Sequence, residues 1–221
     1  MLPNWEGAPP ESPVILAVCD ASDFVAHGAS FIRSAFAHKI DVHIHLVNPS
    51  SRCLQGVYHL MSEGKTNFTV TREETTESGY PVKLRALNCL LAHGYPILML
   101  DIHTVINKEF KFPESKCGFY KKDGVVNKNI LFVTDVFQPH LNRLFLGCML
   151  TTEHDKYMQG FSGDISRLHG EEDIFFGEDV MSNKPNDDTV FWLKSEHDKY
   201  VKEKRSYGLL LSQNRSGKKA I

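Results

Sequence analysis

Cysteine is scarce in this chain, and its spacing suggests no cross-linked or zinc-bound framework. The 221 residues include five cysteines, an odd number, without a Cys-x-x-Cys pair. Disulfide-stapled domains and structural zinc sites need paired or closely spaced cysteines. The cysteines therefore favour a protein of a reducing cytoplasm.

Long apolar runs are missing as well. The first residues, MLPNWEGAPPES, contain neither a basic nor an apolar stretch, so they do not resemble a secretion signal. No later run approaches the roughly 20 apolar residues that cross a bilayer. We therefore expect a soluble cytoplasmic protein with no membrane partner.

The chain also lacks a strong excess of charge, internal repeats and low-complexity segments. Hydrophobic residues make up 42% and charged residues 24%, and the formal net charge is -2. This balance is typical of a globular protein and excludes an overall field that would bind polyanions. For this length we expect a single domain at residues 14–221, preceded by an irregular N-terminal arm at residues 1–13.

Apolar runs of strand length alternate with a helical pattern. The first run ends at Cys19 and Asp20, and residues 22–38 then show the apolar spacing of a helix. DVHIHLVNPS predicts a second strand that ends in a turn. This order is the unit of a mostly parallel sheet covered by helices on both faces. Because ligands bind beyond the carboxyl ends of such strands, we expect Asp20, Asn48 and Asp101 to converge.

The stretch ILMLDIHTVI carries Asp101 and His103 where the apolar run stops. Side chains two apart on a strand project from the same side. A carboxylate and an imidazole together suit manganese, zinc or iron, and such a metal could hold the diphosphate of a nucleotide. In the alternative interpretation, Asp101 caps the following turn and His103 is a hydrogen-bonded histidine at the strand end.

A second motif with the same spacing is His43-x-His45. It resembles the metal motif at the start of some metal-dependent hydrolases, which use a barrel of typically about 250 residues. Further ligands of that kind have no recognisable place in this chain. The favoured interpretation is two hydrogen-bonded histidines on one face of a covered strand.

Two later segments contain candidate polar groups. Glu178 and Asp179 follow an apolar IFF; they either favour a helix N-terminus or, in a cleft, act as a general base or charge stabiliser. Backbone amides around Gly217, beside Lys218 and Lys219, would suit a phosphate oxygen, unless this basic end is disordered. The stretch NKEFKFPESKCGFYKKDGVVNKN is expected to be a surface loop.

In their order, these segments resemble the small GT-A-type glycosyltransferases of bacteria and phages, which use nucleotide-activated sugars. The similar phrases are HIHLVNPS, the arginine-bearing helix PVKLRALNCLL, and ILMLDIHTVI at the place of the Asp-x-Asp metal motif of the family. Here the motif is the Asp-x-His of Asp101 and His103, a variant known in polypeptide GalNAc-transferases. The resemblance implies a GT-A (Rossmann-like) mixed, mostly parallel sheet, a nucleoside-diphosphate sugar as donor, and a Mn²⁺ or Mg²⁺ cofactor.

The resemblance also implies roles for residues that bind the nucleotide sugar. Cys19, Asp20 and Ala21 would line the base and ribose, and Arg85 would reach the nucleotide or its phosphates. Asp101 would contact the donor together with the metal. FLGCMLTT is similar to the strand that lies under donor sugar and acceptor.

Catalytic and C-terminal positions are implied in the same way. GEDVM falls where inverting relatives have a catalytic Asp and retaining relatives an Asp-Gln pair. In the first alignment Asp179 deprotonates the acceptor; in the second Glu178 takes the Asp position and no base is assigned. SQNRSGKK retains the Gly217 and Lys218 of the family but lacks its metal-binding histidine, for which His197 is a substitute.

The leading hypothesis is therefore metal-dependent transfer of a sugar to an acceptor hydroxyl. A GT-A-like protein that binds nucleotides without catalysis is one alternative, and a hydrolase that uses His43 and His45 is another. The acceptor is a glycan, a protein, a small metabolite or a modified DNA base such as hydroxymethylcytosine. A DNA acceptor needs a basic surface, for which the lysines of 108–128 and 199–219 are candidates unless they are a solvated face.

Overall fold

The computed structural model describes residues 4–6, 13–63, 68–106, 112, 117–122, 125–169 and 174–177. Its strands are β1 (Asn4–Glu6), β2 (Val14–Asp20), β3 (Asp41–Val47), β4 (Phe68–Glu73), β5 (Ile97–Leu100), β6 (Cys117–Lys122), β7 (Val125–Val133) and β8 (Ile174–Gly177). Its helices are α1 (Ala21–Asp23), the π-helix η1 (Phe24–Gly28), α2 (Ala29–Ala37), α3 (Ser51–Ser62), α4 (Tyr80–Leu91), the 3-10 helix η2 (Asp135–Phe137), α5 (Gln138–Met149) and α6 (His154–His169).

The described strands form one sheet in the order β1-β4-β3-β2-β5-β7-β6-β8. Strand β2 pairs in parallel with both β3 and β5, and β3 pairs in parallel with β4. Antiparallel pairs join β1 to β4, β5 to β7, and β6 to β7, whereas β8 is parallel to β6. The predicted mixed, mostly parallel sheet is confirmed.

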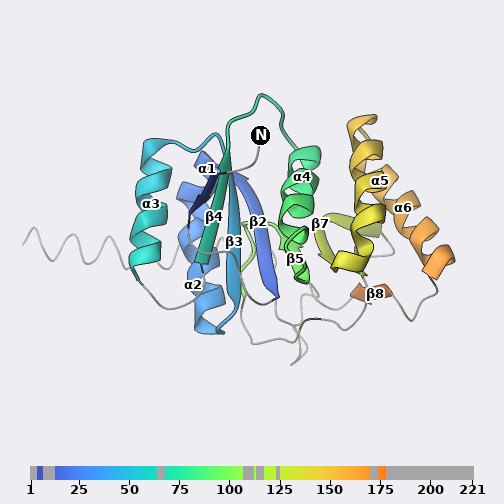
Figure 1. Ribbon diagram of the computed structural model, residues 1–221, viewed down its shortest axis with the longest axis horizontal. Helices are drawn as coiled ribbons and strands as arrows, with labels where there is room; N and C mark the ends of the chain where they lie inside the picture. Colours follow the sequence, from blue (N-terminus) through green and yellow to red (C-terminus); the bar gives the residue numbers. More distant parts are fainter. Residues whose placement is uncertain are drawn as a thin grey trace, which may run out of the picture.

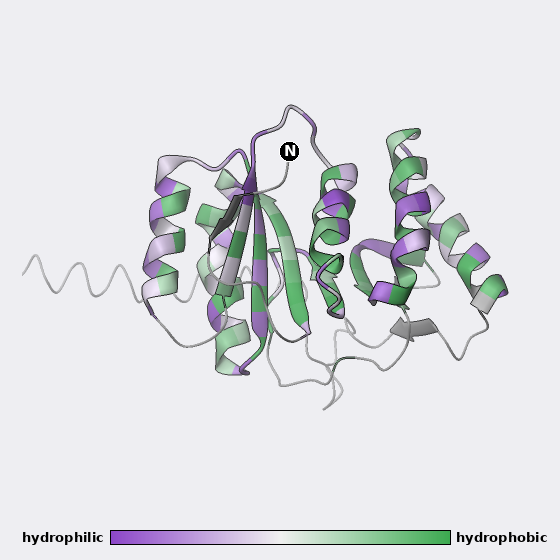
Figure 2. Cartoon of the chain, in the orientation of Figure 1, coloured by the Kyte–Doolittle hydropathy of each residue, from purple (hydrophilic) through white to green (hydrophobic). Residues whose placement is uncertain are grey.

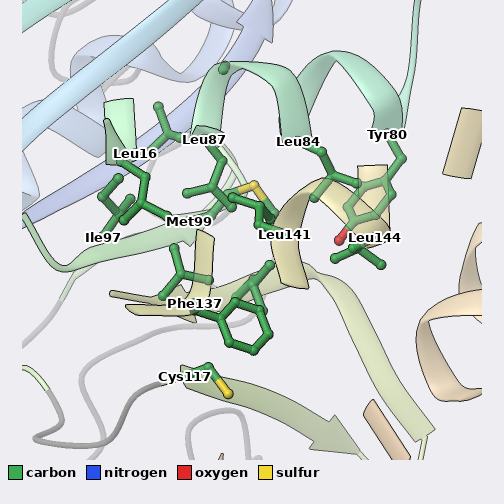
Figure 3. Close-up of a cluster of buried hydrophobic side chains, with 14 of the residues drawn as sticks. Leu16, Tyr80, Leu84, Leu87, Ile97, Met99, Cys117, Phe137, Leu141 and Leu144 are labelled. Carbon is green, nitrogen blue, oxygen red and sulfur yellow. The ribbon is translucent and has the colours of Figure 1, made fainter. Parts of the chain in front are cut away.

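Helices cover both faces of the sheet, as predicted (Figure 1). Alternate residues of β2 face opposite layers: Leu16 packs with α4 and α5, whereas Ile15 packs with α2 and α3. Figure 3 shows the first layer, in which Leu87 of α4 lies near Leu16 and Leu84 of α4 lies near Leu144 of α5. Both faces of β2 are buried, and its sequence is apolar as far as Cys19. Strand β3 is buried as well, but its apolar residues alternate with His43 and His45 (Figure 2).

The helix expected at residues 22–38 is present but interrupted. The π-helix η1 separates α1 from α2, and the ring of Phe24 lies over Gly28, where an added Cβ would come within 2.7 Å of it. Only a glycine permits this close approach. The wider turn of η1 thus lets Phe24 reach the core beneath it, where it is 3% exposed.

Three expectations for individual segments need correction. Strand β1 lies within the stretch expected to be irregular and pairs with β4. The expected loop contains β6 and the start of β7, because Cys117 and Phe119 alternate toward the core. FLGCMLTT is not a strand: it begins inside α5, where Leu141, Leu144 and Cys148 are buried at helical spacing.

Candidate functional site

The three expected polar strand ends lie at one edge of the sheet. Strand β2 lies between β3 and β5 and runs parallel to both, so their carboxyl ends are side by side. Asp20 ends β2, Asn48 follows β3, and Asp101 follows β5. The side chain of Asn48 bonds both ways with the backbone of Thr75, which holds the β4–α4 connection against the same edge. The predicted grouping of strand ends is confirmed.

Asp101 and His103 bond to each other in a tight turn. Oδ1 of Asp101 accepts from the backbone N–H of His103 at 3.1 Å and lies 2.5 Å from its Nδ1. The carbonyl of Asp101 also accepts from the N–H of Thr104 at 2.9 Å. These contacts match the alternative interpretation of the motif, in which Asp101 caps the turn and His103 is a hydrogen-bonded histidine at the strand end.

The carboxyl group of Asp101 is nevertheless held in its ionised form. Its partial burial opposes ionisation, but the positive charge of Lys83 and the hydrogen bonds from His103 outweigh that burial and lower the pKa of Asp101. Lys83 comes from α4 and also donates to Asn129 of β7 at 3.0 Å. Asp101 is therefore an accessible negative charge beyond the end of β5.

Two further side chains complete this edge, and the sequence analysis missed both. Nε2 of His103 lies 3.9 Å from Oδ1 of Asp23, and the His103 ring lies 4.3 Å from that of His27. Asp23 and His27 are four residues apart after the first strand, a spacing that places them on one side of a helical turn. This four-residue spacing is the feature of the sequence that could have indicated that Asp23 and His27 lie close together.

The described part of the chain contains no group of three or more histidine, cysteine, aspartate or glutamate side chains arranged to hold a metal. A cation on Asp101 and His103 would therefore take its other ligands from water, from a substrate, or from outside the described ranges. Mg²⁺ commonly takes several ligands from water and substrate phosphates, but the imidazole of His103 suits manganese, zinc or iron better. Binding to both side chains would exchange their mutual hydrogen bond for two metal–ligand bonds.

Cys19, Asp20 and Ala21 lie at the end of β2, with different exposures. Cys19 is 5% exposed, and burial raises the pKa of its thiol, so it is a neutral core group. Asp20 is exposed and caps α1: Oδ1 accepts from the N–H of Asp23 at 2.8 Å and from the Ser22 hydroxyl at 2.7 Å. These two hydrogen bonds lower the pKa of Asp20.

Arg85 lies on the second turn of α4 and is held by two carboxylates. Its Nη2 is 2.6 Å from Oε1 of Glu73, its Nε donates to the other oxygen of Glu73 at 3.4 Å, and its Nη1 contacts Glu77. The Arg85 side chain is 30% exposed. Its guanidinium group is therefore at the same edge of the sheet, with both flanks occupied by acidic side chains.

His43 and His45 are buried and hydrogen-bonded, as the favoured interpretation predicted. His43 contacts the hydroxyl of Thr69 through Nδ1 at 2.7 Å and that of Thr71 through Nε2 at 2.8 Å. His45 contacts Thr71 through Nδ1 at 2.8 Å. Burial lowers the pKa of His43 to about 3 and also lowers that of His45. These contacts give no support to a metal-dependent hydrolase.

The remaining predicted site residues lie outside the described ranges. These are Glu178, Asp179, His197, Gly217 and Lys218. Two cavities are lined by described residues, and neither is lined by a predicted site residue. One of about 390 Å³ lies between α5 and α6, and one of about 190 Å³ lies between η1, α2 and α3.

Sequence comparison identifies no relative: no family model matches the chain, and no curated protein is significantly similar to it. Solved structures do match. The galactosyltransferase LgtC, in complex with donor and acceptor sugar analogues, superposes with a TM-score of 0.52 at 12% identity, covering 80% of this chain and 85% of its own. A glycosyltransferase involved in glycosylating the major capsid of PBCV-1 gives 0.51 at 10% identity, covering 86% and 99%.

A fragment of S. aureus TarS gives a TM-score of 0.55 at 13% identity and covers 86% of this chain, which spans 63% of the fragment. The shared architecture is the mixed sheet with helices on both faces. The chain therefore has a GT-A-type fold, as the sequence analysis predicted. None of the described helices is long and apolar enough to cross a membrane.

Proposed function

We propose that this protein is a glycosyltransferase that moves a sugar from a nucleoside-diphosphate sugar to an acceptor hydroxyl with the help of Mn²⁺ or Mg²⁺. The observation that carries the proposal is the ionised Asp101 with His103 at the end of β5, on the carboxyl edge of a GT-A-type sheet. In such sheets a ligand binds at this edge. Both side chains are partly exposed, at 34% and 21%, and so can meet a ligand.

Asp101 and His103 would hold the cation, with His197 as a further ligand. The bound cation would neutralise the charge that develops on the departing nucleoside diphosphate. The bond between the anomeric carbon and the phosphate oxygen breaks, its electron pair stays on the diphosphate, and the acceptor oxygen bonds to the carbon. In the inverting alternative Asp179 takes the acceptor proton. In the retaining alternative Glu178 takes the position of the family's Asp, no protein base is assigned, and the proton would pass to the departing diphosphate oxygen.

The other residues of the proposed site bind the nucleotide. Ala21 and the exposed Asp20 would contact base and ribose, with the buried Cys19 forming the floor behind them. Arg85 would meet the phosphates, together with Gly217 and Lys218 in the proposed single domain of residues 14–221. Arginine suits this role because its planar N–H groups match phosphate oxygens.

Calorimetric titration tests the proposal. UDP, GDP and CDP are each titrated with and without Mn²⁺ into the wild type, Asp101→Asn and the control Asp155→Asn, which changes an exposed carboxylate on α6. We expect one nucleotide to bind in a Mn²⁺-dependent way to the wild type and the control, and at least about tenfold more weakly to Asp101→Asn. Equal affinities in all three proteins would contradict the proposal.

A non-catalytic nucleotide-binding protein is the second candidate. It is favoured by the absence, among described residues, of a complete metal-binding group. It predicts nucleotide binding that does not depend on Asp101, with no hydrolysis or transfer of the sugar. Measuring release of the nucleoside diphosphate from the matching sugar nucleotide separates the two candidates.

The acceptor class stays open between a glycan, a protein, a small metabolite and a hydroxymethylated DNA base. Among the candidate lysines, Lys128 pairs with Asp155 at 2.8 Å, which reduces the positive charge it offers. A DNA acceptor would bind with an affinity that falls steeply as salt is raised. Titration of duplex DNA at two salt concentrations therefore tests this class directly.

A further inference from the structure

Polar side chains form a ladder across strands β3 and β4, on the face of the sheet opposite α2 and α3. We call it the β3–β4 ladder; its members are His43, His45, Thr69, Thr71 and Glu73. The register pairs His43 with Thr69 and His45 with Thr71, and Glu73 comes next along β4 on the same face. Each ring nitrogen of His43 and the Nδ1 of His45 lies 2.7 to 2.8 Å from a threonine hydroxyl. The ladder therefore runs continuously toward the carboxyl edge.

The outer end of the ladder fixes where its protons lie. Arg85 and His45 outweigh the effect of partial burial and lower the pKa of Glu73, so its carboxylate can only accept. Its Oε1 lies 3.6 Å from Nε2 of His45. This distance exceeds that of a hydrogen bond, but the negative charge still favours the neutral tautomer with the proton on Nε2.

The other protons follow from this one. With Nε2 protonated, Nδ1 of His45 accepts, so the hydroxyl of Thr71 must donate to it. The lone pair of Thr71 then accepts from Nε2–H of His43 at 2.8 Å. Nδ1 of His43 is left to accept from Thr69 at 2.7 Å. Every hydrogen bond in the ladder thus points toward Glu73.

Glu73 in turn forms a two-point ion pair with one side of the Arg85 guanidinium group. Both of its oxygens face the guanidinium group, at 2.6 and 3.4 Å, and its side chain is 21% exposed. The opposite side of Arg85 contacts Glu77, whose side chain is 46% exposed. Glu73 is therefore the anchored partner, whereas Glu77 comes from an exposed connection and can move aside.

We propose that the β3–β4 ladder positions Arg85 through Glu73, so that an anionic phosphate ligand binds the guanidinium group in exchange for Glu77. Glu73 and His45 are positioning residues, and Glu77 is a built-in competitor for the anion. The proposal rests on the proposed function only for the identity of the ligand, the diphosphate of a nucleotide.

The test uses opposite effects of two matched substitutions. Inorganic pyrophosphate is titrated without metal into the wild type, Glu73→Gln, Glu77→Gln and the control Glu63→Gln, which alters the surface pair with Arg33. Loss of the competitor in Glu77→Gln should tighten binding severalfold, and loss of the anchor in Glu73→Gln should weaken it about tenfold. A general effect of negative charge would instead tighten binding in both variants.

The proposal is overturned if both variants change the affinity in the same direction. It is also overturned if neither the wild type nor Glu77→Gln binds pyrophosphate. Glu77→Gln keeps the ladder intact, so a folding defect in Glu73→Gln does not remove the test. Nuclear magnetic resonance of the ring nitrogens adds a readout without ligand: His43 and His45 should both carry their proton on Nε2, and Glu73→Gln should mix the tautomers of His45. Pyrophosphate binding with these signs, but no binding of any nucleotide with Mn²⁺, would reject the proposed function and retain this inference.

Discussion

The pair His43 and His45 and the pair Asp101 and His103 have the same spacing along the chain, yet they lie in different surroundings. The first pair lies inside β3, where the two residues are 1% and 3% exposed and contact threonines of β4. The second pair follows the end of β5, where its members bond to each other and His103 faces Asp23.

This difference shows that the role of two polar residues spaced two apart depends on whether they lie inside a strand or beyond its end. Inside a strand, both side chains meet the neighbouring strand, and cross-strand partners satisfy them. Beyond the strand, the backbone turns, and a carboxylate bonds to the N–H groups that follow it. The buried pair therefore stabilises the fold, whereas the exposed pair can receive a ligand.

Acidification should produce the largest effect, and it acts on the buried pair. The pKa of His43 is about 3 in the folded protein because of burial. In the unfolded chain it is near 6.5, so below that pH the unfolded state binds more protons. Stability is therefore complete above about pH 6.5 and should fall as pH drops toward 3, by roughly 1.4 kcal/mol per pH unit.

Urea denaturation between pH 7.5 and 4 measures this slope, with His43→Leu as the reference. The carboxylates contribute equally to both proteins, so the difference between the two slopes belongs to His43. Parallel pH profiles would show that His43 does not resist protonation in the folded state.

His43→Leu at neutral pH should give the next largest effect. The substitution leaves the hydroxyl of Thr69 buried without its histidine partner, whereas the hydroxyl of Thr71 keeps its bond to His45. We expect a loss of about 1 to 3 kcal/mol in the free energy of unfolding, the cost of one unsatisfied buried group. Combining it with Thr69→Val should cost less than the sum of the two single changes, which a double-mutant cycle measures.

His103→Ala should weaken ligand binding and leave stability almost unchanged, the opposite of His43→Leu. His103 is partly exposed, and its removal leaves Asp101 still accepting from a backbone N–H, so unfolding should change by less than about 1 kcal/mol. Metal-dependent nucleotide affinity should fall about tenfold. A large loss of stability with unchanged affinity would place His103 with the structural histidines.

The sequence predicted the central part of this fold better than its flanks. Fully apolar runs identify β2 and β5, because central parallel strands are buried on both faces. Strand β6 was not predicted, because lysines follow its alternating Cys117 and Phe119. The stretch FLGCMLTT, which begins inside α5, was predicted as a strand from the family resemblance. Periodicity does not distinguish such short runs.

For the candidate site, the strand-end positions of Asp20 and Asp101 followed from the pattern, but their partners did not. Arg85 was recognised, whereas its anchor Glu73 was not, because that contact depends on how α4 lies against β4. His27 joins the site through the π-helical turn. Contacts of this kind are set by packing between elements, which a single sequence does not encode in its local pattern.

Substitutions of Asp20 should have the smallest effect and test whether one residue of the exposed edge also has a structural role. Asp20→Ala removes the cap on the N–H of Asp23 and should destabilise the protein by about 1 kcal/mol, whereas Asn keeps an accepting oxygen and should cost a few tenths. Thermal unfolding of the two variants measures this difference. If the proposed ribose contact uses the carboxylate, both variants should bind the nucleotide more weakly while only Ala loses stability. Equal stability losses in Ala and Asn would instead mean that the charge of Asp20, rather than its cap, matters to the fold.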